Sequence, residues 1–275
     1  MSLEQTVSEH YSNKGLLNKI YKGLEKLGID KNQLTQSDLS SFDEFHIGGS
    51  EGTLMLAEKL TMNASSSVLD IGCGIGGPAR FLSSEFGCKV SGIDLTADFV
   101  NTGNSLTDQV GLSDKVKLIE ASALSIPFAD NSFDVSYMIH VGMNIADKDV
   151  LFSEAFRVTK PGGVFGIYDV MLLGNCELQY PLPWAVEEDG NAIASATDYI
   201  SALIKAGFSL KHEDDKTDFA NSFFEKMSAR TDSSDGPPPV GLHLLMGDLT
   251  TQKIRNMAKL IKSGIIAPKI LILEK

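Results

Sequence analysis

Cysteine, tryptophan and clustered basic residues are all scarce in this sequence. The three cysteines, Cys73, Cys88 and Cys176, are odd in number and widely spaced. This pattern excludes a disulfide framework, fits no zinc-site spacing and favours a reducing compartment. We therefore predict a cytoplasmic protein without a metal site.

Long apolar runs and a basic charge balance are missing too. No apolar run approaches the roughly 18 residues that a membrane span requires, and residues 1–10 are polar, without the core of a secretion signal. The 36 acidic residues outnumber the 24 basic ones, which gives a net charge of −12. Such a surface repels phosphate backbones. We therefore expect that the protein binds neither membranes nor nucleic acids. We also expect it to be a monomer or a homodimer.

From Ser67 onward, short apolar runs alternate with helical patterns. This order predicts an α/β fold with a doubly wound, mostly parallel sheet. Ligands of such sheets bind beyond the carboxyl ends of the strands. The predicted strands span residues 68–71, 89–95, 115–120, 133–139, 164–170, 208–214 and 269–273, and the helices 78–86, 97–110, 150–158, 196–206 and 250–262.

About 65 residues precede the first predicted strand. They hold an amphipathic helix that ends at Gly28 and a second helix from an N-cap at Ser50 to Leu60. This segment is too short for an independent domain. We predict that residues 1–64 form a helical lid and that residues 65–275 form the main domain, with a cap insertion near 215–250.

The most informative segment is the glycine-rich loop after the first strand. Glycines permit a sharp turn and leave the backbone bare for a ligand. Gly72, Gly74 and Gly77 fit the G-x-G-x-x-G pattern of dinucleotide sites, whereas Gly72, Gly74 and Gly76 fit the tighter G-x-G-x-G of S-adenosylmethionine sites. Either match alone is weak.

Two acids at strand ends help to choose between these patterns. Asp70 would repel a dinucleotide's pyrophosphate but attract the sulfonium and ammonium of S-adenosylmethionine. Asp94, at the end of the second strand, can accept hydrogen bonds from ribose hydroxyls. The structural alternatives are that Asp70 caps the turn and that Asp94 caps the next helix.

These motifs together resemble a class I S-adenosylmethionine-dependent methyltransferase, over roughly residues 60–215. The resemblance implies a Rossmann-like sheet of seven strands, with the last strand, Lys269–Leu273, antiparallel. Further segments resemble the sarcosine/dimethylglycine N-methyltransferase-like group. The motifs of the class are Val68–Gly77, Asp94, Ile126–Phe128, Ser132–Val135 and Arg157–Gly163, and those of the group are Asp43–Gly49, Met143–Lys148, Pro181–Ala185 and Gly241–Gly247.

The resemblance implies S-adenosyl-L-methionine as cofactor, with S-adenosyl-L-homocysteine as product, and a small-molecule methyl acceptor, loosely an amine. Asp70, Gly72 and Gly74 would hold the methionine part, while Leu95 would pack on adenine. Ser122 stands where relatives often carry an acid that meets the adenine amine. The full predicted cofactor set is Asp70, Gly72, Cys73, Gly74, Gly76, Asp94, Leu95, Ser122, Ala123 and His140.

Methyl transfer to nitrogen needs an unprotonated amine, so a base or a desolvating pocket is expected nearby. The predicted catalytic residues are His140, which follows the fourth strand, His46, which precedes a Gly-Gly pair, and Tyr11. Each histidine is about as well explained by packing. The predicted substrate-binding residues are Phe45, Met143, Asn144, Trp184 and Arg230, the arginine as a partner for a carboxylate.

Three other functions remain open at this point. An oxygen- or carbon-methylating enzyme would use the same fold. An NAD(P)-dependent oxidoreductase would use the same glycine-rich loop. A protein that binds the cofactor without catalysis would share the motifs but not the reaction.

Overall fold

The computed structural model describes residues 2–12, 14–174, 176–232 and 238–275. It contains a seven-stranded sheet of order β3-β2-β1-β4-β5-β7-β6. Neighbouring strands from β3 to β5 pair in parallel, and β7 runs antiparallel to both β5 and β6. This confirms the predicted doubly wound sheet and its reversed last strand. The strands are β1 Ser67–Ile71, β2 Lys89–Asp94, β3 Val116–Glu120, β4 Phe133–Ile139, β5 Thr159–Leu172, β6 Ser209–Asp215 and β7 Ile266–Glu274.

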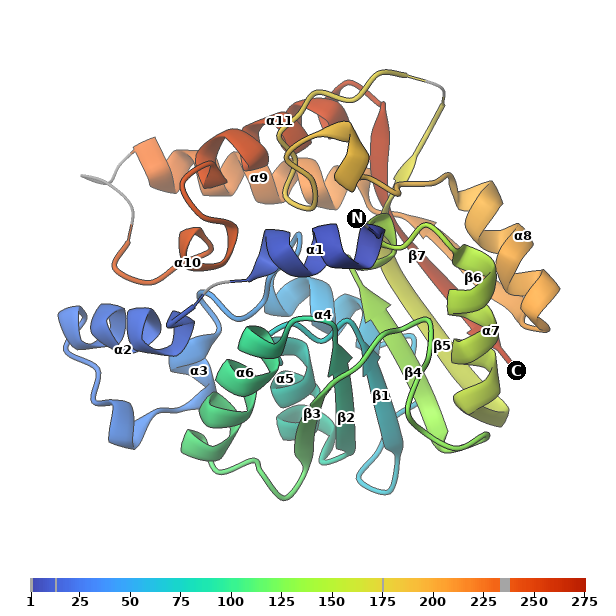
Figure 1. The fold of residues 1–275 in the computed structure, drawn as a ribbon, viewed down its shortest axis with the longest axis horizontal. Helices are drawn as coiled ribbons and strands as arrows, with labels where there is room; N and C mark the ends of the chain where they lie inside the picture. The colour runs from blue at the N-terminus through green and yellow to red at the C-terminus, as the bar shows by residue number, and fades with distance from the viewer. Residues whose placement is uncertain (1, 13, 175, 233–237) are drawn as a thin grey trace.

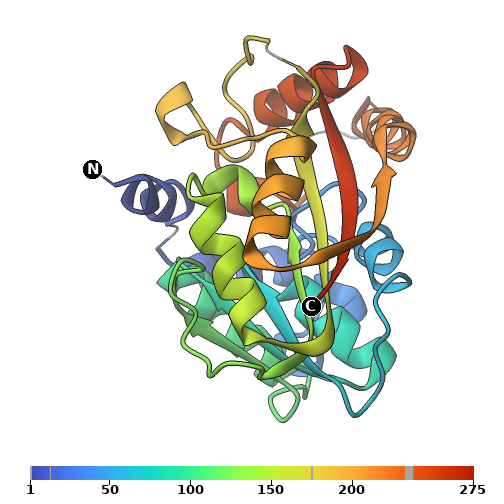
Figure 2. The ribbon, with the colours of Figure 1, turned by 90° about the vertical axis from the view of Figure 1, so that its right-hand side faces the viewer.

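Helices cover both faces of the sheet (Figures 1 and 2). Successive β1 residues point to opposite faces, so Leu69 packs in the core formed with α7 and α8, whereas Val68 packs in the core formed with α4, α5 and α6. The helices are α1 Leu3–Tyr11, α2 Leu16–Lys26, α3 Gln36–Leu39, α4 Ser50–Ala57, α5 Gly77–Phe86, α6 Ala97–Gln109, α7 Lys148–Val158, α8 Ala196–Ala206, α9 Thr217–Asp232, α10 His243–Met246 and α11 Thr250–Lys262, with 3-10 turns η1 Lys31–Gln33, η2 Gly142–Asn144 and η3 Glu188–Gly190.

Three local predictions differ from the structure. The fifth strand, predicted from residue 164, begins already at Thr159, and its first part is irregular: Gly162 has a φ of 74° and the pairing with β4 shifts. The N-cap of α4 is Gly49, and Ser50 is already helical. Helix α1 was not predicted, although Ser2 and Gln5 form a capping box that starts it.

Two parts of the chain lie at the carboxyl ends of the strands. Figure 1 shows α1 between these ends and the helices α9, α10 and α11. All three helices lie between β6 and β7; α9 and α10 fall within residues 215–250, where the sequence predicts a cap insertion, and α11 follows it. Helix α2 packs against α6 through Leu16, Ile20 and Leu24. The carboxyl edge of the sheet is therefore covered from two sides.

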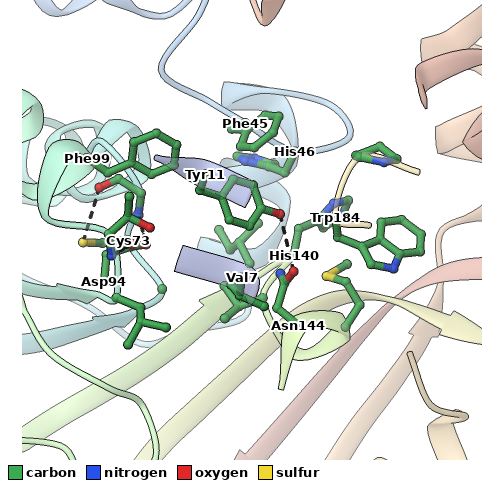
Figure 3. A pocket seen from close by; sticks show the side chains of 18 of the residues that line it. Val7, Tyr11, Phe45, His46, Cys73, Asp94, Phe99, His140, Asn144 and Trp184 are labelled. Atoms are coloured by element: carbon green, nitrogen blue, oxygen red, sulfur yellow. Dashed lines mark hydrogen bonds between the residues drawn. The ribbon is translucent and has the colours of Figure 1, made fainter. Parts of the chain in front are cut away.

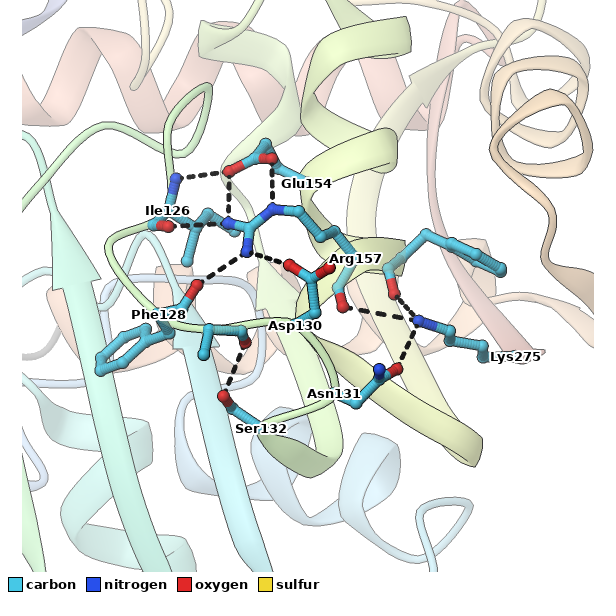
Figure 4. Close-up of polar contacts among 10 residues, drawn as sticks. Ile126, Phe128, Asp130, Asn131, Ser132, Glu154, Arg157 and Lys275 are labelled. Atoms are coloured by element: carbon cyan, nitrogen blue, oxygen red, sulfur yellow. Dashed lines mark hydrogen bonds and ion pairs between the residues drawn. The ribbon is translucent and has the colours of Figure 1, made fainter.

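One arginine ties the loop at residues 126–130 to helix α7. Arg157 on α7 binds both carboxylate oxygens of Glu154 and one of Asp130, and it donates to the carbonyls of Ile126 and Phe128 (Figure 4). It thereby holds the loop that leads into β4. Arg157 has a structural role and lies away from the carboxyl edge of the sheet.

A second arginine joins the N-terminal segment to the main domain. Arg80 on α5 is fully buried and forms an ion pair with Asp43 at 2.9 Å. It also donates to the carbonyls of Ile75 and Gly103 and to the hydroxyl of Thr107. Because every one of these partners is buried around it, the guanidinium cannot be removed without leaving several of them unsatisfied.

We predict that Arg80→Met lowers the free energy of unfolding by about 3–5 kcal/mol, the range for breaking a buried ion pair. Urea denaturation measures the change. The control is Lys205→Met, which removes an exposed ion pair with Asp149 and should leave the unfolding curve where it was. Equal curves for Arg80→Met and the parent would contradict the prediction.

Candidate active site

A single continuous cavity of about 380 Å³ lies at the carboxyl ends of β1, β2 and β4. Its walls come from the loops after these strands, from α1 and η2, and from α9, α10 and α11. Figure 3 shows Cys73, Asp94 and Phe99 on one side, Trp184 on the other, and Tyr11 and His140 between them. The cavity thus has two ends that meet under α1.

The glycine-rich loop forms the first end. Gly72 and Gly74 both have positive φ values, 77° and 54°, which only glycine adopts at low cost. A side chain at Gly72 would collide with Val141, whereas one at Gly74 would meet nothing within 4 Å. Gly74 therefore presents bare backbone to the cavity. Gly72, Cys73 and Gly74 line it, and Gly76 does not.

Asp94 ties the loop to the end of β2. Its carboxylate accepts the backbone N–H of Gly74 at 2.9 Å and that of Thr96 at 2.9 Å. Burial raises the pKa of Asp94 above its ordinary value. Leu95 and Ala123 line the cavity beside it. Ser122 stands outside the wall, where its hydroxyl bonds to Glu4 of α1.

Asp70, the acid at the centre of the sequence argument, lies behind the cavity wall. Its side chain is buried, and among the described residues Oδ2 has no hydrogen-bond partner. Burial, with a contribution from the charge of Asp94, raises the pKa of Asp70 to about 7. Glu44 is similarly placed, because burial and then the neighbouring Asp43 raise its pKa to about 8. Buried acidic groups are therefore concentrated at this end.

His46 is held by short polar contacts. Its Nε2 lies 3.0 Å from the carbonyl of Gly49 and 3.1 Å from the hydroxyl of Thr53, which itself donates to Glu44 at 2.8 Å. Burial lowers the pKa of His46 to about 4. This side chain is therefore neutral at neutral pH.

His140 lines the middle of the cavity. Its φ is 54°, unusual for a residue with a side chain, and its N–H donates to the carbonyl of Tyr168 at 2.8 Å. The ring lies 5.9 Å from that of His46, and Nε2 is buried with no hydrogen-bond partner among the described residues. Burial and then the neighbouring His46 lower the pKa of His140 well below its ordinary value. A neutral imidazole therefore lines the cavity, and its Nε2 is buried without a partner among the described residues.

Tyr11 covers the same place from α1. Its hydroxyl donates to Asn144 over a long 3.5 Å, and its ring packs near Phe45 and Phe99 (Figure 3). Tyr11, Phe45 and Asn144 all line the cavity. The structure therefore brings the predicted catalytic residues Tyr11, His46 and His140 into one pocket.

The second end of the cavity is apolar. Met143 and Trp184, both predicted from the sequence, are buried here, and the indole N–H of Trp184 donates to Asn191 at 2.8 Å. Arg230 falls in α9, and its side chain lies outside what the structure describes. Sequence reasoning missed most of this wall, although the apolar residues of the insertion were a signal for it: Phe223, Phe224, Met227, Leu242, Leu245, Met246, Ile254 and Met257.

Sequence reasoning also missed the group that fixes η2. Asp169, buried at the carboxyl end of β5, accepts the N–H of Gly142 and the hydroxyl of Tyr199, each at 2.8 Å. Burial raises its pKa to about 6. A lone acid inside the apolar run of β5 was the available signal. Through this contact β5 positions Met143 and Asn144 in the cavity.

The sequence and the fold are both similar to those of known methyltransferases. Residues 69–167 match the sequence model of a family described as "Methyltransferase domain". Sterol 24-C-methyltransferase ERG6B of Gibberella zeae is 35% identical over 166 residues, which cover 58% of this chain and 44% of that protein. The chain spans about half the length of the curated relatives it matches.

Solved structures share the fold at low identity. Geranyl diphosphate C-methyltransferase of Streptomyces coelicolor A3(2), in complex with Mg²⁺, geranyl diphosphate and S-adenosyl-L-homocysteine, has a TM-score of 0.72 at 18% identity and covers 100% of this chain and 98% of its own. A Galdieria sulphuraria protein described as a candidate sarcosine dimethylglycine methyltransferase has a TM-score of 0.65 at 21% identity, covering 81% and 84%. Over residues 69–167 the chain matches this methyltransferase domain, and its fold is that of the solved class I methyltransferases, as the sequence predicts.

The buried His46 generates a pH prediction. Its pKa is about 4 in the folded protein and about 6.5 when unfolded. As the pH falls, His46 is therefore protonated first in the unfolded chain. Between about pH 6.5 and pH 4 the free energy of unfolding decreases by about 1.4 kcal/mol per pH unit. His46→Gln removes this loss. Urea unfolding at pH 8, 6 and 5 should show the parent losing stability relative to the variant; a constant difference would contradict the prediction.

Proposed function

We propose that this protein transfers a methyl group from S-adenosylmethionine to a small-molecule acceptor, with an unprotonated amine nitrogen as the first candidate for the accepting atom. One observation supports this most strongly. A single cavity joins a glycine-rich loop with acidic surroundings to an apolar end, and Tyr11 and His140 lie where the two ends meet.

The residues present fit the cofactor. Gly74 offers open backbone, Asp94 offers a carboxylate, and the unpaired Oδ2 of Asp70 lies just behind the wall. These groups favour a ligand that carries positive charge. Gly72, Gly74, Asp94, Leu95 and Ala123 would hold S-adenosylmethionine, which supplies an activated methyl group when bound.

The chain's own part in the reaction is orientation and exclusion of water. Orientation alone can supply roughly 7–11 kcal/mol. An alkylamine with a pKa near 10 costs about 4 kcal/mol to deprotonate at pH 7. The apolar end lowers this cost by disfavouring the charged form. The imidazole of His140, which lines the cavity, would accept the proton that the acceptor loses, and the hydroxyl of Tyr11 would orient the acceptor.

An amino-acid acceptor and a nicotinamide cofactor are less well supported. No lysine or arginine lines the cavity among the described residues, so a substrate carboxylate finds no partner there. The acidic groups behind Gly72 would repel a diphosphate. A carbon or oxygen acceptor is the second candidate, which the apolar wall favours.

We also propose that α1 acts as the lid predicted for residues 1–64. It lines the cavity through Leu3, Val7 and Tyr11, yet none of its residues is fully buried. A helix with so little buried surface is expected to open at low cost. The proposed lid movement would admit the ligands.

We predict that Asp94→Ala weakens binding of S-adenosylhomocysteine by about 1–3 kcal/mol, because two backbone amides and the ligand lose their acceptor. Titration calorimetry measures this. Glu120→Ala is the matched control, since Glu120 is an exposed carboxylate at the end of the neighbouring strand β3. If Asp94→Ala and the control bind S-adenosylhomocysteine with equal affinity, Asp94 does not take part in binding it.

We predict that His140→Asn slows turnover by about 100-fold or more, the lower range for loss of a proton acceptor, while cofactor affinity stays within about twofold, ~0.4 kcal/mol. Asparagine tolerates the positive φ at this position. The assay follows release of S-adenosylhomocysteine across amines, phenols and unsaturated alcohols. If the variant turns over at the parental rate, His140 only contributes to packing. If the parent releases no S-adenosylhomocysteine with any acceptor, a protein that binds the cofactor without catalysis is favoured.

A further inference from the structure

We infer that the acceptor is an uncharged, mostly apolar molecule with one polar group, and that this group lies beside His140. The inference rests on the proposed function, because it assigns the apolar end of the same cavity to the acceptor. We call this end the acceptor chamber and define it by Met143, Trp184, Phe223, Phe224, Leu242 and Met257.

The chamber walls carry no charge of either sign. All six defining side chains are apolar or aromatic, and Ile254 and Leu245 extend the same surface. The insertion between β6 and β7 supplies most of them, from α9, α11 and the residue that precedes α10. A charged skeleton placed here would lose its hydration without gaining a partner, which costs several kcal/mol.

The acidic residues that line the cavity already have partners elsewhere. Glu4 meets the hydroxyl of Ser122, and Asp147 accepts the N–H of Val150 at the start of α7. Asp43 pairs with Arg80, and Asp94 accepts two backbone amides. These acids surround the cofactor end and the opening, so they do not make the acceptor chamber a site for cations.

Two buried lysines near the chamber are likewise engaged. Lys253 of α11 donates to the carbonyl of Met246 at 3.1 Å and touches His10 of α1. Lys148 donates to the carbonyls of Ile145 and Ala192. Neither lysine lines the cavity. An anionic acceptor therefore has no counter-charge among the described residues.

The polar groups at the inner limit of the chamber are few and neutral. They are the hydroxyl of Tyr11, the amide of Asn144 and the imidazole of His140. Hydrogen-bonding groups at one end of an apolar pocket fix the orientation of a ligand. Methionines at the other end adapt to its shape. The arrangement matches a hydrocarbon skeleton that ends in a hydroxyl or an uncharged nitrogen.

The chain contains one tryptophan, Trp184, and it lines the chamber. Its fluorescence therefore reports directly on chamber occupancy. The experiment titrates the full chain, saturated with S-adenosylhomocysteine, with three probes of one chain length: 1-decanol, decanoate and decyltrimethylammonium. We expect 1-decanol to change the Trp184 emission and to bind at least about tenfold more tightly than either ion, ~1.4 kcal/mol.

A variant with a matched control tests the location. Ile254→Lys introduces a cation into the chamber wall, and Leu249→Lys introduces one at an exposed position just before α11. We expect Ile254→Lys to bind decanoate more tightly than 1-decanol, reversing the parental order, while Leu249→Lys keeps that order. Thermal unfolding followed by circular dichroism establishes whether both variants fold. If either does not, the comparison of the three probes with the parent protein still tests the inference.

Tight binding of decanoate or decyltrimethylammonium by the parent would overturn the inference, as would no response of Trp184 to 1-decanol. Calorimetry with S-adenosylhomocysteine alone separates the two proposals. If that ligand fails to bind while 1-decanol binds without it, the proposed methyl transfer fails and the assignment of the chamber survives. If the cofactor product binds and the probe order is reversed, the inference alone fails.

Discussion

The burial of four carboxyl groups at one end of the sheet is the constraint on which the site depends. Asp43, Glu44, Asp70 and Asp94 lie near the ends of the first two strands, and Arg80 is the one cation paired with them among the described residues. Burial alone raises the pKa of an acid, and neighbouring acids raise it further. The protein therefore maintains an end of its cavity where a positively charged ligand is electrostatically favoured.

The same burial shapes the other parts of the cavity. The exclusion of water that raises the pKa of Asp70 also keeps His46 and His140 neutral. Neutral imidazoles and an apolar chamber suit an uncharged acceptor, while the acidic end suits a cation. One cavity can thus hold two ligands of different charge, with α1 across both. The proposed roles of the two ends therefore rest on the distribution of charge more than on any single side chain.

The fold, and the residues that meet at the proposed cofactor end, could be predicted from the sequence because their signals are local. Apolar runs and glycine spacing place the strands, and the parallel order brings Gly74 and Asp94 together. The acceptor chamber could not be predicted in this way, because α9, α10 and α11 meet Met143 and Trp184 only through tertiary packing. Asp70 shows what a sequence motif cannot predict. The motif places an acid in the first strand, but it does not show that the carboxyl group lies behind the cavity wall.

Titration calorimetry with S-adenosylmethionine and NAD⁺, at pH 6 and pH 8 and in buffers of different ionisation enthalpy, tests the electrostatic account most directly. A cation beside Asp70 favours the ionised carboxylate, and the pKa of Asp70 is about 7 without one. The account predicts that S-adenosylmethionine binds, more tightly at pH 8, and releases protons, while NAD⁺ gives no heat. Binding of NAD⁺ without S-adenosylmethionine, or cofactor binding that is independent of pH, would contradict it.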